Sequence, residues 1–443
     1  MGSYKSPTTR LIAFFGRVNY SFDDRYLVTL NLRYEGSSKF YSDRWGLFPG
    51  ISAGWRISSE KFMRNVRAVD DLKLRVSYGT TGNQGFNTNT AYRMYSKDSW
   101  TYYNGQWMTV YGLMHNQNRD MKWEIKKEFD VGLDFSLFNR RLNGRMDYFS
   151  RKIEDAIYSG IPVASPPAVY ATSTVNIGDI TNKGFEFELN GRVVDTKDWT
   201  FDTSLVGSFV GKSRLEGMAK DTHMEFQAMP HGGGSAVRIF GGQEIGRYFL
   251  YRFAGVREED GTPMIYSKDN KVIPYASGTD EDRVQTGNGL QKAVLSWNNT
   301  VRYRNWDLNL FFRSWLGQDV YNVTDMIQGV NCKITEGQNL LRTAYRRNKA
   351  ITNTDRLMLL DYWLEKGDFL KLDAVTLGYT LPRNKIKYVE KLRCYFTVRN
   401  VCTLTGYSGL DPEVNVNGLA PGFEGMSQYP RTRSFILGIE IGF

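Results

Sequence analysis

The last ten residues constrain the fold of this chain most, because they alternate between two kinds of side chain. In the segment 434–443, one face carries Phe435, Leu437, Ile439, Ile441 and Phe443. The other face carries two glycines and Glu440, with Ile436 as the one exception. A period of two is typical of a half-buried β-strand. A soluble domain usually lets its terminus fray, whereas a closed membrane barrel needs a complete last strand to pair with its first.

The same alternation recurs along the whole chain. In one example, Val28, Leu30 and Leu32 alternate with Thr29 and Asn31. Thirteen such segments are predicted, at 12–22, 26–38, 45–57, 72–80, 129–137, 141–158, 185–190, 199–210, 293–304, 306–313, 368–382, 391–403 and 431–443. The sequence therefore predicts an all-β protein.

The connections between these segments alternate between short and long. The short ones are 23–24, 58–71, 139–140, 195–198, 304–305 and 383–390. The long ones are 39–44, 81–121, 160–174, 211–292, 317–367 and 404–430. Up-and-down outer-membrane barrels have short periplasmic turns and long extracellular loops. The same parity predicts that the strand-like segment 246–255 lies inside one extracellular excursion, 211–292, and not in the barrel wall.

Charged side chains lie opposite the apolar face of the predicted strands. The candidates for a polar lumen are Arg33, Arg75, Asp134, Arg145, Glu186, Asp307, Arg313 and Glu440. Burying so many charges in a dry core would be costly unless they were paired. They suit a wet barrel lumen, with the apolar face toward lipid. A soluble antiparallel sheet with one wet face is the alternative, which the loop parity disfavours.

Composition excludes several other functions. Aromatic residues make up 14% of the chain, which suits the girdles of a membrane barrel. The net charge of +10 comes from scattered Lys and Arg without a basic run, so nucleic-acid binding is not predicted. The three cysteines have no C-x-x-C spacing, and no disulfide framework, metal site or cofactor is expected. No apolar run approaches the length of a transmembrane helix or a signal segment.

Catalytic chemistry is not predicted either. The only histidines are His115, His223 and His231, and all three lie in predicted loops. No nucleophile motif accompanies them, so the chain is not expected to be an enzyme.

One aromatic loop segment, Trp100–Trp107, is a candidate binding surface. Trp100, Tyr102, Tyr103 and Trp107 lie beside Asn104 and Gln106. Flat rings next to amides suit the capture of a sugar or peptide by stacking and hydrogen bonding. The alternative is that the rings pack against neighbouring loops or against a lid protein.

Several stretches in order carry a resemblance to a known family. They are 15–21, 52–58, 71–79, 121–124, 132–135, 182–187, 368–372, 375–382, 406–412 and 429–432. Together they resemble the C-terminal part of SusC/RagA-type TonB-dependent transporters, which are outer-membrane barrels of Bacteroidetes-like bacteria. The stretch 266–271 departs from an acidic turn of that family and is too degenerate to predict a calcium site.

The resemblance implies an incomplete transmembrane antiparallel barrel. Residues 1–443 would supply about the last thirteen of about 22 strands. The signal peptide, the TonB-contacting motif, the plug and the early strands would be absent. Phe443 would be the signal that the outer-membrane assembly machinery reads.

The implied function is nutrient uptake across the outer membrane, with an oligosaccharide or oligopeptide as substrate. The implied partners are a SusD-like surface lipoprotein, the TonB complex through the missing N-terminal part, and outer-membrane lipids with lipopolysaccharide. A soluble secreted all-β glycan-binding module is the rival hypothesis.

Overall fold

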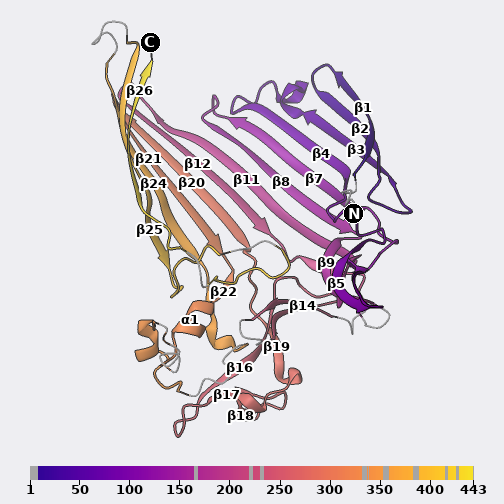
Figure 1. Cartoon of the computed structure of the whole chain (residues 1–443). Helices are drawn as coiled ribbons and strands as arrows, with labels where there is room; N and C mark the ends of the chain where they lie inside the picture. Colours follow the sequence, from indigo (N-terminus) through magenta and orange to yellow (C-terminus); the bar gives the residue numbers. More distant parts are fainter. Residues whose placement is uncertain are drawn as a thin grey trace.

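Thirteen long strands form one antiparallel sheet in the computed structural model. The structure describes residues 8–163, 168–218, 223–229, 234–331, 337, 339–352, 359–382, 389–414, 418–425 and 429–442. Each strand pairs with the next along this wall (Figure 1). The wall strands are β1 (Leu11–Phe22), β2 (Tyr26–Ser37), β3 (Trp45–Arg56), β4 (Val69–Asn83), β7 (Glu124–Leu137), β8 (Leu142–Glu154), β11 (Asp179–Asp195), β12 (Trp199–Val210), β20 (Ala293–Tyr303), β21 (Trp306–Leu316), β24 (Phe369–Thr380), β25 (Lys391–Thr405) and β26 (Ser434–Gly442). The thirteen strands predicted from alternation are confirmed.

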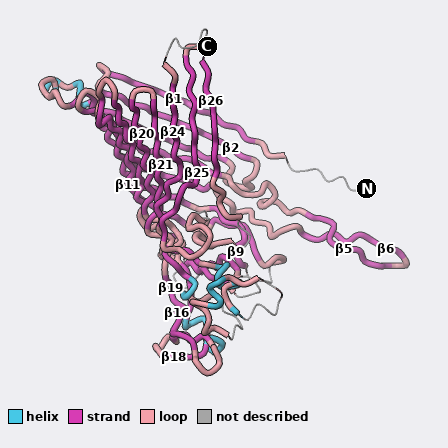
Figure 2. Tube along the Cα trace, turned by 90° about the vertical axis from the view of Figure 1, so that its left-hand side faces the viewer, coloured by secondary structure: helices cyan, strands magenta, loops and turns pink. Residues whose placement is uncertain are grey.

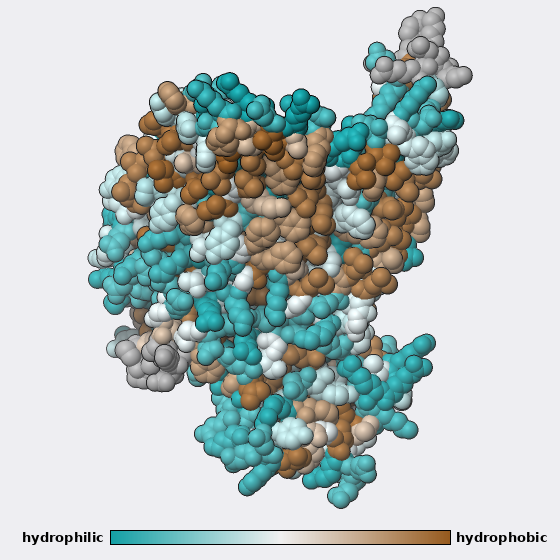
Figure 3. Space-filling view, turned by 180° about the vertical axis from the view of Figure 1, so that it is seen from behind, coloured by the Kyte–Doolittle hydropathy of each residue, from teal (hydrophilic) through white to brown (hydrophobic). Residues whose placement is uncertain are grey.

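The pairing register places apolar side chains opposite apolar side chains across the wall. Near one edge, Val18 pairs with Leu30, and Leu30 pairs with Ile51. Near the other edge, Phe396 pairs with Leu437, which is 80% exposed. The convex side of the wall therefore carries an apolar band, shown in brown across the upper part of Figure 3, that suits contact with lipid.

The short turns lie at one end of the wall, and three of them are built from left-handed residues. Asp23, Asp24 and Arg304 have φ near +50°, and the 138–140 turn has three successive positive φ values. Such turns match the twist of the flanking strands and close tight hairpins. The last strand also ends at this short-turn end, as the loop parity predicts (Figure 1).

The wall curves but does not close. Among the residues that the structure describes, β1 and β26 each pair with one neighbour only, β2 and β25 respectively. Figure 2 shows the curved wall with both edge strands, β1 and β26, in view. The unclosed sheet agrees with the predicted incomplete barrel.

We expect that residues 1–443 alone form no conducting pore, because unpaired strand edges leave backbone groups unsatisfied in lipid. The measurement is unitary conductance in planar bilayers after refolding of this polypeptide. Stable channel currents from it would contradict the expectation.

The long connections contain their own small sheets. The short strand β13 (Arg214–Glu216) pairs with β11 and extends the wall sheet locally. In the described residues, the strands of the small sheets are β5 (Tyr95–Tyr103), β6 (Gln106–Leu113), β9 (Ile157–Pro162), β10 (Thr172–Asn176), β14 (His223–Ala228), β15 (Ser235–Phe240), β16 (Tyr248–Val256), β17 (Pro263–Tyr266), β18 (Val272–Pro274), β19 (Arg283–Thr286), β22 (Asp319–Tyr321) and β23 (Leu364–Lys366). β16 belongs to a six-stranded sheet with β14 to β19, while β12 pairs directly with β20. The prediction that 246–255 lies outside the wall is therefore confirmed. The predicted strand 141–158 is instead two strands, because Asp155 has a φ of 51° and breaks the ladder.

Helical structure is sparse. Within the described residues it consists of the α-helix α1 (Val323–Gln328) and the 3-10 turns Ile57–Ser59, Lys61–Met63, Tyr275–Ser277, Asp280–Asp282, Arg342–Tyr345 and Asp361–Trp363. Within the described ranges, no helix has both the length and the apolar character needed to cross a bilayer.

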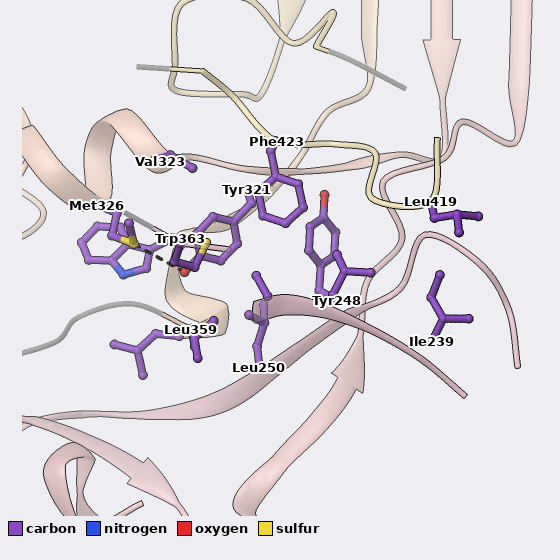
Figure 4. Close-up of a cluster of buried hydrophobic side chains, with 14 of the residues drawn as sticks. Ile239, Tyr248, Leu250, Tyr321, Val323, Met326, Leu359, Trp363, Leu419 and Phe423 are labelled. Carbon is purple, nitrogen blue, oxygen red and sulfur yellow. Dashed lines mark hydrogen bonds between the residues drawn. The ribbon is translucent and has the colours of Figure 1, made fainter. Parts of the chain in front are cut away.

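Four long connections pack into one folded unit at the long-loop end, with a core of buried side chains. Tyr248 comes from the 211–292 connection, Tyr321 and Trp363 from the 317–367 connection, and Phe423 from the last long connection (Figure 4). The connection between β8 and β11 adds Ala156 and Ile177 to the same core. The Tyr248 hydroxyl donates hydrogen bonds of 2.9 Å to the carbonyl oxygens of Asp319 and Gly422. We call this unit the extracellular unit.

Candidate lumen site and extracellular surface

The concave face of the wall carries a charge network centred on Arg75. Its guanidinium donates to Asp134 at 2.8 Å and to Asp147 at 2.7 Å, while Asp130 lies 4.0 Å away. Strands β4, β7 and β8 are neighbours, so their polar positions meet on one face. The structure thus brings together two predicted lumen residues, Arg75 and Asp134, and adds two aspartates around the same cation.

The other predicted lumen residues on β2, β8 and β11 each contact a single charged or polar partner and are not part of the Arg75 network. Arg145 is 3.1 Å from Glu188, and the Ser208 hydroxyl donates to Glu186 at 3.3 Å. Arg33 pairs with Glu35 on its own strand. These side chains lie on the polar face, as the alternation requires, and remain partly exposed.

Toward the short-turn end, two more networks cross strands. Asp202 accepts from Arg192 at 2.9 Å and from Arg302 at 2.7 Å. Asp307 accepts from Arg393 at 3.0 Å. Glu440, another predicted lumen residue, lies 2.6 Å from Lys391 on the adjacent strand.

The most buried charge on the wall is Lys371, which the sequence did not single out. Its side chain is 1% exposed, and its ammonium donates to Asp411 at 2.8 Å and to Glu413 at 2.9 Å. Arg313, a predicted lumen residue, contacts the same Glu413 at 3.1 Å, and Arg431 contacts Asp411 at 2.9 Å. We call this cluster the loop clamp, because it fixes the connection between β25 and β26 to the wall.

The loop clamp gives one carboxylate a shifted pKa. Burial opposes ionisation of Glu413, but hydrogen bonds from Arg313 and Lys371 outweigh it and hold the Glu413 pKa below its ordinary value. Ionised Glu413 therefore contributes stability above the unfolded-state pKa, which is about 4.3. This contribution is lost as the pH falls through the lower folded-state pKa.

We expect the loop clamp to weaken in acid through Glu413. Between neutral pH and about pH 3, the unfolding midpoint of the wild type should fall more steeply than that of Glu413→Gln, which has no charge to lose. The measurement is the thermal midpoint against pH for both proteins. Parallel profiles would contradict the assignment.

The predicted aromatic segment forms the β5/β6 hairpin, which projects away from the wall (Figure 2). Tyr103 is 70% and Trp107 is 68% exposed. Tyr102 and Trp107 pack edge to face with centroids 5.3 Å apart, and the Lys97 ammonium lies 3.8 Å from the Trp100 ring centroid. The four candidate rings are thus grouped and largely uncovered, whereas their role as binding residues stays a prediction.

The remaining candidates have structural partners or lie outside the described residues. The His115 ring nitrogen is 2.8 Å from the Asn89 carbonyl oxygen, and His223 is 3.7 Å from Glu225. His231, Cys332 and the proposed assembly residue Phe443 lie outside the described residues. In the described part of the chain, no group of three or more His, Cys, Asp or Glu residues is arranged to hold a metal ion.

The curved antiparallel wall, apolar outside and polar inside, defines a partial outer-membrane β-barrel. Over residues 2–401 the sequence matches the family described as TonB dependent receptor-like, beta-barrel, and the chain belongs to that family. This is a family of receptors rather than of enzymes, and it places the chain in the outer membrane. The rival hypothesis of a soluble secreted module therefore finds no support.

The relatives are consistent with the SusC/RagA type. The chain is 29% identical over 475 residues to the TonB-dependent receptor SusC of Bacteroides thetaiotaomicron, covering 98% of this chain and 44% of the relative. It is 27% identical over 470 residues to the TonB-dependent receptor P3 of Formosa agariphila, covering 98% of this chain and 46% of the relative. The chain thus spans less than half the length of these relatives.

Solved structures show the same fold. The RagAB peptide transporter superposes with a TM-score of 0.83 at 22% identity, covering 98% of this chain and 47% of that one. The RagAB peptide importer in its closed-closed state gives a TM-score of 0.81 at 21% identity, with 98% and 48% covered.

Proposed function

We propose that this chain forms wall, lumen lining and extracellular loops of a transporter that imports an oligosaccharide or oligopeptide across the outer membrane. The observation that carries the proposal is the concave face of the wall. Its charges pair across strands and remain partly exposed, as expected for a water-filled path and not for a dry core. Barrels of this size enclose a plugged lumen.

The proposal includes the partners expected from the resemblance. A SusD-like surface lipoprotein would cap the extracellular loops, and the TonB complex would act through a plug outside residues 1–443. The likeness to RagAB, a peptide importer, and to SusC supports a two-component importer. The two candidate substrate classes are both retained, and the uptake experiment below separates them.

The β5/β6 hairpin is proposed to contact either the substrate or the lipoprotein. In the full-length transporter, Trp100→Ala/Trp107→Ala is expected to weaken one of these two affinities about tenfold, which corresponds to about 1.4 kcal/mol. The reason is the loss of two large, exposed rings that can stack on a ligand or fill a partner's pocket.

The measurement has two arms in a strain that lacks the chromosomal gene. One arm follows the uptake of labelled oligosaccharides and labelled oligopeptides, and the other follows co-purification of the lipoprotein. Tyr345→Ala/Tyr429→Ala is the matched control, because both rings are exposed in other long connections. Unchanged substrate affinity together with unchanged lipoprotein association would exclude both roles. If deletion of the gene left the uptake of both labelled oligosaccharides and labelled oligopeptides unchanged, the proposed function would be overturned.

A further inference from the structure

The connection between β3 and β4, residues 57–68, folds onto the lipid-facing side of the wall. Its Glu60 carboxylate accepts hydrogen bonds from the Tyr26 hydroxyl at 2.7 Å and from the Trp55 indole nitrogen at 3.1 Å. Tyr26 and Trp55 are paired residues at the end of the apolar band. Figure 2 shows the short helical turns (cyan, upper left) projecting on the side of the wall opposite to the β5/β6 hairpin.

This connection exposes apolar and cationic side chains together. Phe62 is 65% and Val66 is 41% exposed. The side chains of Lys61, Arg64 and Arg67 are also exposed, and none of them forms an ion pair with any residue of the described ranges. The segment therefore presents two apolar groups and three cations that have no ion-pair partner in the part of the chain that the structure describes.

The neighbouring carboxylates are already engaged and do not neutralise these cations. Glu60 holds Tyr26 and Trp55 and lies 3.5 Å from Arg25. Asp71 accepts from the Ser58 hydroxyl at 2.7 Å, and Asp70 accepts from the Arg140 backbone amide at 2.8 Å. A positive, partly apolar surface thus remains at the rim of the wall.

We propose that residues 57–68 form a membrane-surface anchor that binds anionic phospholipid headgroups of the periplasmic leaflet. Phe62 and Val66 enter the acyl boundary, while Lys61, Arg64 and Arg67 contact lipid phosphates. Aromatic side chains with a polar tip mark the edge of the apolar band, and Tyr26 and Trp55 hold the anchor at that level. Basic residues next to inserted rings are the composition of interfacial membrane-binding segments.

Lipid is favoured over a periplasmic protein because the anchor is continuous with the lipid-facing band. The turn lies on the convex side, where the neighbouring wall residues already require lipid contact. Short turns mark the periplasmic end of outer-membrane barrels, so the leaflet concerned is the phospholipid leaflet.

The test uses the full-length protein reconstituted in vesicles of phosphatidylethanolamine with a minor share of phosphatidylglycerol. Native mass spectrometry then counts the lipids retained by the protein. The wild type is expected to enrich phosphatidylglycerol, and Lys61→Gln/Arg64→Gln/Arg67→Gln to lower that preference by about fivefold for each charge removed. Phe62→Ser is expected to lower the retention of both lipids.

A matched variant at the opposite end of the molecule separates this site from general charge effects. Arg342→Gln/Arg346→Gln/Lys349→Gln removes three exposed cations from a long connection and should leave the lipid preference intact. Each variant is first checked for folding by its heat-dependent mobility in gels. An unchanged preference in the 61/64/67 variant would overturn the proposal, as would an equal loss in the control. Loss of a bound periplasmic protein with unchanged lipid retention would also overturn it.

Discussion

Replacing Lys371 with Met is expected to destabilise the loop clamp by about 3 kcal/mol. Removal of one partner from a buried ion pair typically costs about 3–5 kcal/mol, because the remaining charges stay buried with less compensation. Lys371 is 1% exposed and holds both Asp411 and Glu413. The lower end of the range applies, because Arg431 and Arg313 still contact these carboxylates.

The same substitution at Lys391 is the matched control. Lys391 on β25 also pairs with a glutamate, Glu440 on the adjacent strand β26, at 2.6 Å. Both of these side chains, however, are about half exposed. Exposed pairs contribute little. The measurement is hydrogen exchange of residues 404–414 together with the thermal midpoint of the full-length protein. Equal effects of Lys371→Met and Lys391→Met would show that burial does not govern the clamp.

The wall could be predicted from the sequence because the alternation that marks each wall strand lies within the strand itself. A strand in a membrane barrel alternates lipid-facing and lumen-facing residues, so a segment such as 26–34 reveals its face without reference to any partner. Up-and-down topology then fixes the neighbours, since each strand pairs with the next. That Arg75 and Asp134 lie on neighbouring strands follows from this topology. Their ion pair does not, because Arg75 stands opposite Gly132 and reaches Asp134, Asp130 and Asp147 only through its side chain.

The loop clamp could not be predicted in this way. Lys371 lies inside the predicted strand 368–382, but its partners Asp411 and Glu413 are 40 and 42 residues away in an irregular connection. Irregular segments have no period that reports which way a side chain points. The family resemblance covered Lys371, Asp411 and Arg431 in the stretches 368–372, 406–412 and 429–432, but it gave no contacts between them.

The extracellular unit was missed for the same reason. The sequence placed 246–255 inside one long excursion without contacts to the others, whereas the structure shows four connections sharing one core. The hydrogen bond between Tyr248 and Gly422 joins residues 174 positions apart. The unit packs like a soluble domain, so its stability depends on burial and not on lipid.

Replacing Tyr248 with Ala is therefore expected to destabilise the extracellular unit by about 3–5 kcal/mol while the wall stays folded. Truncation of a buried aromatic residue loses its transfer free energy and leaves a cavity. Tyr248 is fully buried, and its ring lies 5.2 Å from that of Phe423. The substitution also leaves the carbonyl oxygens of Asp319 and Gly422 without this donor.

The measurement is limited proteolysis of the full-length protein in the membrane. Tyr248→Ala should expose the 211–292 connection to protease, while the protein keeps the heat-dependent gel mobility of a folded barrel. Tyr266→Ala is the matched control, because Tyr266 belongs to the same six-stranded sheet but is 37% exposed. Tyr248→Phe keeps the ring and should show a smaller effect, of about 1 kcal/mol, through loss of the hydroxyl alone. If Tyr248→Ala also abolished the gel mobility of the folded barrel, the wall and the extracellular unit would fold as one cooperative body. If Tyr248→Ala stayed resistant to protease, the shared core would not be what holds the connections together.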